Sequence, residues 1–259
     1  MKRLCLMLML VGSMVGCITT GPSNKDVIES TETGIGGAPD LTLSMRIYLP
    51  TVEEGKKYPL CIYLHDTGGV GTDGLSNLDD GANNLVRYVK SSDTPSFILI
   101  PQCPKGKEWK DEDVMVSLNE ILTIWLQKEE VDKDRVYLTG FGMGGEGAWF
   151  YALEFPDELS TIAPVCGGSL AIKQTKDPIV PMALSEMNIW AIHYLDDRVR
   201  TSDLSKKILS GVWTQNVALS RLTEFPSGGH TPVVYKDEGF LGWLFATRRA
   251  SEERKDNGN

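Results

Sequence analysis

The chain has 259 residues, of which 41% are hydrophobic and 24% charged, so it can fill a sizeable core and is not disordered as a whole. Its formal net charge is −9, and it has no stretch rich in lysine and arginine. Because a nucleic-acid-binding protein needs a basic face that displaces counterions, we exclude that class.

Residues 1–16 have the features of a signal peptide. A basic pair at residues 2–3 precedes an apolar run at residues 4–11, which is far shorter than the ~20 residues that span a bilayer. The segment Met14–Cys17 resembles the bacterial lipobox, in which the cysteine is lipid-modified and becomes amino-terminal after cleavage. We therefore expect a lipoprotein of the cell envelope, anchored to the membrane outside the cytoplasm through Cys17. Ordinary secretion with an unmodified cysteine is the alternative.

Residues 17–40 are rich in Gly, Ser, Thr and charged residues, and they predict a flexible tether. Residues 249–259 predict a disordered polar tail. Between them, residues 41–49 alternate with period two, which indicates an edge or antiparallel strand. Compact apolar runs predict further strands at 60–64, 97–100, 136–138, 161–165, 189–193 and 222–225. Helical patterns lie at 81–91, 113–129, 143–154, 202–215 and 238–248.

This alternation of strands and helices predicts a single α/β domain over residues 41–248. The expected core is a mostly parallel sheet of about seven or eight strands with helices on both faces. Ligands of such sheets bind beyond the carboxyl ends of the strands. Four polar or glycine-rich clusters follow predicted strands, so we expect their loops to form one site: residues 65–69, 140–145, 196–197 and 228–230.

Three cysteines belong to the predicted domain. Cys61, Cys103 and Cys166 lack metal-ligand spacing to one another or to a histidine, so we expect no metal centre. Cys61 lies in an apolar run, so we expect it to be a core residue. A disulfide between Cys103 and Cys166 is compatible with an oxidising compartment, but the sequence does not establish it.

A strand, a glycine-rich turn and a helix are predicted in succession at residues 136–149. The turn Gly140-Phe-Gly-Met-Gly144 resembles the nucleophile elbow of the α/β-hydrolases, whose pattern is G-x-S-x-G. Gly142 stands where that family has its nucleophilic serine. The glycines also resemble a dinucleotide-binding loop, but they lie in mid-chain without a βαβ unit and a ribose-binding acid. We therefore expect no cofactor.

The resemblance extends well beyond this turn. Matching segments lie at residues 58–69, 97–109, 132–149, 155–168 and 225–232. They are similar to esterase/peptidase-like α/β-hydrolases, a group that includes small carboxylesterases, feruloyl-type esterases and polyhydroxybutyrate-depolymerase-like lipoproteins. The resemblance covers roughly residues 41–247 and implies the α/β-hydrolase fold and serine ester hydrolase chemistry.

The resemblance also assigns a histidine and an acid. His230 corresponds to the family's catalytic base, and Asp197 to the acid that orients it. Asp196 is a near alternative for the acid, and a solvated turn carboxylate without function is another reading of Asp197. The remaining histidines, His65 and His193, are expected to be structural and to bond loop backbone.

The same resemblance places an oxyanion hole at backbone N–H groups. One donor is expected at Met143 and a second near Thr67 or Gly68. Asp66 stands where the family usually has glycine, which disturbs the geometry of the second donor. Trp109 either lines the site or caps the core.

A serine hydrolase without its hydroxyl forms no acyl-enzyme, and serine proteases that lack a triad member keep only ~10³–10⁴-fold catalysis over water. Glycine also relieves the strain of positive φ at an elbow, whether the residue is natural or engineered. We therefore predict a lipid-anchored pseudo-hydrolase, impaired or inactive because of Gly142. It would keep a cleft for a small-molecule ester or acyl-glycan ligand. The alternative is an active carboxylic-ester hydrolase in which His230 and Asp197 act with water or an unrecognised nucleophile.

Overall fold

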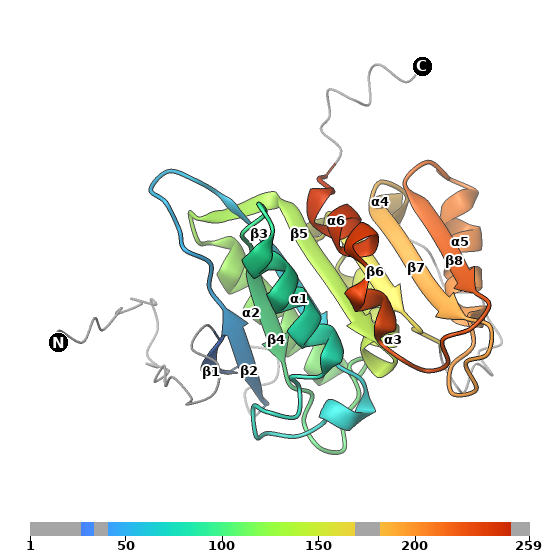
Figure 1. Ribbon diagram of the computed structural model, residues 1–259, viewed down its shortest axis with the longest axis horizontal. Helices are drawn as coiled ribbons and strands as arrows, with labels where there is room; N and C mark the ends of the chain where they lie inside the picture. The colour runs from blue at the N-terminus through green and yellow to red at the C-terminus, as the bar shows by residue number, and fades with distance from the viewer. Residues whose placement is uncertain (1–26, 34–40, 169–181, 250–259) are drawn as a thin grey trace, which may run out of the picture.

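A computed structural model describes residues 27–33, 41–168 and 182–249 (Figure 1). Eight strands of this part form one sheet in the order β1-β2-β4-β3-β5-β6-β7-β8. The strands are β1 (Val27–Thr33), β2 (Thr42–Tyr48), β3 (Tyr58–Leu64), β4 (Phe97–Pro101), β5 (Val131–Phe141), β6 (Thr161–Val165), β7 (Asn188–Tyr194) and β8 (Ser220–Phe225). The helices are α1 (Asp80–Ser91), α2 (Glu112–Leu126), α3 (Met143–Glu154), α4 (Met182–Ser185), α5 (Asp203–Trp213) and α6 (Glu238–Ala246). Short 3-10 turns are η1 (Thr67–Gly69), η2 (Pro156–Glu158) and η3 (Val233–Lys236).

The sheet is mostly parallel, which confirms the predicted α/β-hydrolase fold class. Strands β3 to β8 pair in parallel, whereas β2 is antiparallel to β4 and to β1. The prediction of an antiparallel strand near residues 41–49 is confirmed. That strand is not an edge strand, because β1 covers its free side.

Strand β1 corrects the predicted tether. Residues 27–33 were expected to be part of a flexible segment over 17–40, yet they pair along the whole of β2. This segment contains Val, Ile and Thr, which favour extended backbone, and it satisfies the exposed backbone groups of β2. The predicted signal peptide, Cys17 and residues 250–259 of the tail lie outside the described residues.

Helices cover both faces of the sheet, and each face has its own hydrophobic core. Helices α1 and α6 lie on one face, in front of the sheet in Figure 1, and pack on one cluster of buried residues. Helices α2, α3 and α5 pack on the other cluster. The expectation of helices on both sides is therefore confirmed.

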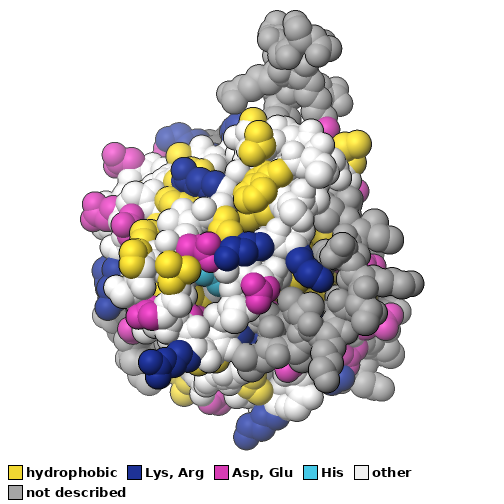
Figure 2. Space-filling view, turned by 90° about the vertical axis from the view of Figure 1, so that its right-hand side faces the viewer, with side chains coloured by type: hydrophobic (Ala, Val, Ile, Leu, Met, Phe, Trp, Pro, Cys, Tyr) yellow, Lys and Arg dark blue, Asp and Glu magenta, His cyan; other side chains and the backbone are white. Residues whose placement is uncertain are grey.

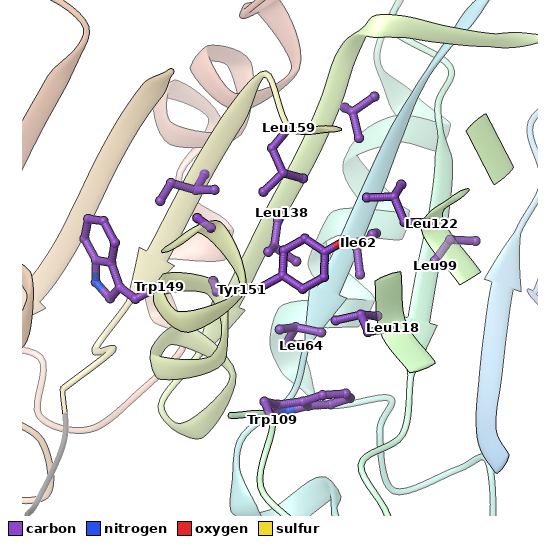
Figure 3. Close-up of a cluster of buried hydrophobic side chains, with 14 of the residues drawn as sticks. Ile62, Leu64, Leu99, Trp109, Leu118, Leu122, Leu138, Trp149, Tyr151 and Leu159 are labelled. Carbon is purple, nitrogen blue, oxygen red and sulfur yellow. The ribbon is translucent and has the colours of Figure 1, made fainter. Parts of the chain in front are cut away.

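Figure 3 shows the second of these cores. Side chains of α2 and α3 lie over the central strands β3 and β5; those labelled include Ile62, Leu64, Leu118, Leu122, Leu138, Trp149 and Tyr151. Trp109 belongs to the same cluster and is only 1% exposed. Its indole Nε1–H donates to the carbonyl oxygen of His65, so Trp109 is a core residue.

The three cysteines of the domain are buried free thiols. Cys61 is in the core, as predicted, and the disulfide considered for Cys103 and Cys166 is not formed. No helix among the described residues is both long enough and apolar enough to cross a membrane.

The order of the strands places the site. Strand β3 lies between β4 and β5, so the chain runs from β3 to β4 on one side and then crosses back past β3 to β5 on the other. Such a reversal opens a crevice at the carboxyl ends of the two strands. The loops after β3 and β5 therefore lie side by side, and the loops after β7 and β8 end on the same edge of the sheet.

Candidate active site

The turn after β5 has the shape of a nucleophile elbow. Gly142 alone separates the end of β5 from the start of α3, and its φ is +58°. A Cβ at Gly144 would overlap the backbone carbonyl of Leu64, so the helix can approach β3 closely only with glycine there. The N–H of Gly142 donates to the carbonyl of Val165 at 3.0 Å, which fixes the turn against β6.

The side chain of Asp66 lies against this turn. Its Oδ1 accepts the backbone N–H of Met143 at 2.7 Å, at the amino terminus of α3. A Cβ added to Gly142 would overlap Asp66 Oδ1. The carboxylate thus occupies the space that a side chain at position 142 would enter.

His230 and Asp197 are brought together by the loops after β8 and β7. His230 Nδ1 lies 2.8 Å from Asp197 Oδ2, and the side chain of Asp197 is fully buried. The other oxygen of Asp197 accepts the N–H groups of Val199 and Arg200 at 2.7 and 3.0 Å. These bonds hold the carboxylate in place, so it orients the imidazole.

Asp196, the alternative acid, does not contact the imidazole ring. Its Oδ1 accepts the N–H of Gly229 at 2.8 Å and so holds the loop that carries His230. The geometry therefore pairs His230 with Asp197. The catalytic role of Asp197 stays a prediction.

The imidazole of His230 lies between two carboxylates. Its Nε2 is 3.4 Å from Asp66 Oδ2, on the side opposite Asp197. The ring of Phe141 packs on it with the centroids 4.6 Å apart. Asp66, His230 and Asp197 consequently form a continuous row that ends at the Met143 N–H.

This row shifts the pKa of each member. Burial lowers the pKa of His230, but hydrogen bonds and charges from Asp66 and Asp197 outweigh burial and raise it above its ordinary value. Burial opposes ionisation of Asp66, yet bonds from His230 and from the Met143 and Thr67 backbones lower its pKa to about 2. Bonds from His230 and from the Arg200 and Val199 backbones likewise lower the pKa of Asp197 against the effect of burial. The row favours an imidazolium between two ionised carboxylates.

The predicted oxyanion donors are arranged around Asp66. The Met143 N–H donates its hydrogen bond to the Asp66 carboxylate. Thr67 and Gly68 lie in the exposed turn η1, where the Thr67 hydroxyl donates to Asp66 Oδ2 at 3.4 Å. A Cβ at Gly68 would point into open space. An anion that enters this hole must therefore displace Asp66.

The other two histidines are buried, and burial lowers the pKa of each to about 4. His65 bonds loop backbone: Nε2 accepts the Cys103 N–H at 3.0 Å, and Nδ1 lies 2.6 Å from the Asp66 carbonyl. His193 differs from the expectation, because its Nε2 contacts the Ser205 hydroxyl of α5 at 2.8 Å instead of loop backbone.

A buried ion pair that the sequence did not indicate joins two of the segments that carry the site. Glu146 is in the first turn of α3 and is 2% exposed. It is bonded by Arg200, whose Nη1 also donates to the Gly168 carbonyl at 2.7 Å, and by Lys110 Nζ at 3.2 Å. The pair links the elbow helix to the loop that holds Asp197. Only the glycine-rich and apolar residues that surround Glu146 in α3 signal that this carboxylate is buried.

One set of side chains in the described residues is close enough to share a metal ion. The ligand atoms of Cys166, Asp197 and His230 lie within 4.8 Å of one another. The hydrogen bond between His230 and Asp197 accounts for their proximity. Burial raises the pKa of the Cys166 thiol, although metals bind the thiolate. The donor set therefore fits a hydrogen-bonded cluster better than a metal centre.

Exposed apolar side chains lie on the loops that carry these residues. Leu195 and Val199 flank Asp197, Phe225 ends β8, and Val233 follows His230 by three positions. Figure 2 shows one face of the molecule, on which hydrophobic side chains lie among charged ones around a histidine. The loops that carry Asp197 and His230 thus expose apolar surface.

The fold and the elbow, with its histidine and acid, define the α/β-hydrolase class. The profile of the family described as "Dienelactone hydrolase family" matches residues 88–254. The chain belongs to this family. A comparison with the sequences of curated proteins gives no significant match.

Solved structures of esterases are similar to the chain. One is a thermostable esterase, with 25% identity and a TM-score of 0.72 over 86% of this chain. The match covers 64% of that esterase, so the chain spans less than two thirds of its length. The feruloyl esterase module from Clostridium thermocellum, solved with sinapinate, has 14% identity and a TM-score of 0.61, with 93% of this chain and 99% of that one covered. An acetyl xylan esterase from a Paenibacillus species has 13% identity and a TM-score of 0.60, covering 90% and 88%. The last two show the fold alone.

Proposed function

We propose that this protein is a lipid-anchored hydrolase-fold protein that binds an ester or acyl-glycan ligand without turning it over through an acyl-enzyme. The observation that carries this proposal is the position of Asp66. Its carboxylate occupies the space beside Gly142 and accepts the Met143 N–H at 2.7 Å. The expected nucleophile is absent, and the expected oxyanion donor already has an anionic partner.

Two effects on ester hydrolysis follow. Without a hydroxyl at position 142, no acyl-enzyme forms, and the rest of a serine site gives only ~10³–10⁴-fold catalysis over water. Loss of one oxyanion donor costs a further ~10²–10³. The two effects share one transition state and need not multiply, but each alone makes the protein a poor esterase.

Direct attack by water activated at His230 is the second candidate, favoured by the contact between His230 and Asp197 at 2.8 Å. A general base must be neutral, however, and the two flanking carboxylates raise the pKa of His230. An oxyanion formed this way would also compete with Asp66 for the Met143 N–H. Both points favour binding over turnover of esters.

The ligand class rests on the surroundings of the site. The exposed apolar residues beside Asp197 and His230 suit an acyl or alkyl group. Esterases are among the structural neighbours, including the feruloyl and acetyl xylan esterases, which supports an ester or acyl-glycan. The lipid anchor is proposed from the Met14–Cys17 segment alone.

Activity and binding are tested on the natural chain. We expect ethyl butyrate to bind in a ligand-observed NMR titration while no butyrate is released, and p-nitrophenyl butyrate to be hydrolysed at the rate of a His230→Ala variant. A fluorophosphonate probe should leave the protein unlabelled. Turnover of p-nitrophenyl butyrate that is lost in His230→Ala would instead support the water mechanism. Covalent fluorophosphonate labelling would contradict the proposal.

The anchor is tested separately by labelling cells with an alkyne palmitate analogue. The natural chain should incorporate the label and remain with the membrane, and Cys17→Ser should do neither. Equal labelling of the two would remove the proposed lipidation at Cys17.

A further inference from the structure

The carboxylate of Asp66 has the contacts that a covalent nucleophile requires. One oxygen is bound by the Met143 N–H at the amino terminus of α3, and the other faces His230 Nε2 at 3.4 Å. His230 is in turn oriented by Asp197. The Asp66 side chain is 21% exposed, so part of this carboxylate is accessible to a small molecule from solvent. Nucleophile, base and orienting acid are thus all present, with the carboxylate replacing a hydroxyl.

The chemistry of a carboxylate decides what it can attack. If Asp66 added to a carboxylic ester, the tetrahedral intermediate would expel the carboxylate again, because it is a weaker base than the alkoxide. At a saturated carbon the outcome is different. A carboxylate displaces a leaving group that is less basic than itself, such as a halide, and a stable alkyl ester results.

We propose that Asp66 is a nucleophile toward saturated carbon, and that the site hydrolyses primary alkyl compounds with a halide leaving group through an Asp66 alkyl ester. In the first step Asp66 Oδ2 forms a bond to the carbon, and the carbon–halogen bond breaks with its electron pair leaving on the halide. The Asp66 side chain becomes a neutral ester, and the halide departs as an anion.

Water then cleaves this ester. His230 Nε2 takes a proton from water, whose oxygen adds to Cγ of Asp66. The negative charge develops on Oδ1, which the Met143 N–H already holds. Collapse expels the alkoxide, which takes the proton back from His230 and leaves as the alcohol. The sum is alkyl halide plus water giving alcohol, halide and one proton.

The electrostatics of the row favour this sequence. Asp66 is one of two carboxylates that raise the pKa of His230, and alkylation removes its charge. Loss of that charge removes one of the causes that raise the pKa of His230, which favours the neutral imidazole that the second step needs. The exposed apolar side chains Leu195, Phe225 and Val233 suit an apolar alkyl chain.

The test uses 1-bromohexane and the full-length protein. In His230→Gln the second step should stop, so a mass increase of one hexyl group should accumulate on the peptide that contains Asp66. In the natural chain, a single turnover in ¹⁸O-water should place ¹⁸O in the Asp66 carboxylate and release unlabelled hexanol, because the alcohol oxygen comes from Asp66. Asp66→Asn should form neither adduct nor hexanol, whereas Asp80→Asn, an exposed aspartate, should match the natural chain.

Direct attack by water would give labelled hexanol and no label on the protein, which overturns the proposal. Absence of hexanol, or an adduct only on another residue, overturns it as well. The isotope measurement needs no variant, so misfolding of a mutant cannot mask the result. The substrate is an alkyl halide and contains no carboxylic ester, so failure of this reaction and failure of the proposed function are separate outcomes.

Discussion

The two halves of the site differ in how far they keep the arrangement of a serine hydrolase. The loops after β7 and β8 place Asp197 against His230 with a fully buried carboxylate and a 2.8 Å contact. The loops after β3 and β5 instead place a carboxylate, Asp66, beside a glycine at the elbow. The histidine and aspartate therefore keep the paired geometry of a serine hydrolase, whereas the half of the site at the elbow does not.

The changed half also shows that two residues distant in the sequence are coupled. Asp66 reaches the Met143 N–H only because Gly142 has no side chain. A carboxylate at position 66 is compatible with glycine at position 142. With a side chain at 142 the carboxylate would clash, and without the carboxylate glycine would leave an empty space. Substitutions at Asp66 and Gly142 that give this half the residues of a serine hydrolase test whether it limits ester hydrolysis.

The largest effect is expected from the double variant Asp66→Gly/Gly142→Ser. It removes the anion from the Met143 N–H and supplies a hydroxyl near His230, so p-nitrophenyl butyrate hydrolysis should rise by about 10³-fold or more over the natural chain. Gly142→Ser alone should stay at least about 10²-fold below the double variant, because Asp66 competes for the serine position and the hole. Steady-state kinetics of the natural chain and the two variants measure this.

Equal rates for Gly142→Ser and the double variant would show that Asp66 does not block the hole. Equal rates for the natural chain and the double variant would contradict the proposed function itself.

A large loss of stability is expected from Arg200→Ala. It leaves the buried Glu146 with Lys110 as its remaining ion-pair partner, and breaking such a pair typically costs about 3–5 kcal/mol. The midpoint of urea unfolding should fall accordingly, whereas Lys56→Ala, in the exposed pair with Glu53, should leave it unchanged. An unchanged midpoint for Arg200→Ala would mean that the ion pair does not join the two halves.

Much of the fold follows from local patterns in the sequence. The strand at residues 161–165 and the helix at 143–154 are predicted with the bounds of β6 and α3, because apolar runs and helical periodicity are local signals. Strand β1 was missed, since its Ser, Thr and Glu content resembles a tether and its stability comes from pairing with β2. Both α2 and α5 end a few residues before their predicted ends, as helix boundaries carry the weakest signal.

Part of the candidate site also follows from the sequence, and part is seen only in the structure. The resemblance placed Asp197 and His230 on loops that do meet, and it noted Asp66 only as a departure from glycine. The direction of the Asp66 side chain depends on the empty space at Gly142, which lies on another strand. The contact of Glu146 with Arg200 spans 54 positions in the chain, and no local pattern reports it. Such tertiary contacts are what the sequence alone left out.

A smaller effect tests the charge balance between the two halves. Asp66→Asn removes one of the two carboxylates beside His230, so the pKa of His230 should fall, and its ring-proton NMR titration should show the shift. Unfolding stability should fall too, by about 1–2 kcal/mol at pH 5, since the lowering of the Asp66 pKa from 3.8 to about 2 corresponds to about 2 kcal/mol.

The pH dependence of that loss is defined by both groups. Asp66, with its lowered pKa, contributes stability above its ordinary pKa of 3.8, and this is lost as the pH falls toward about 2. His230, with its raised pKa, contributes stability fully below 6.5 and loses it as the pH rises through its folded value. The difference between the natural chain and Asp66→Asn should therefore be largest between about pH 4 and 6.5 and smaller at pH 9, with Asp80→Asn as the control. A difference that grows toward pH 9 would mean that Asp66 and an imidazolium do not stabilise each other, and the two halves of the site would then be electrostatically independent.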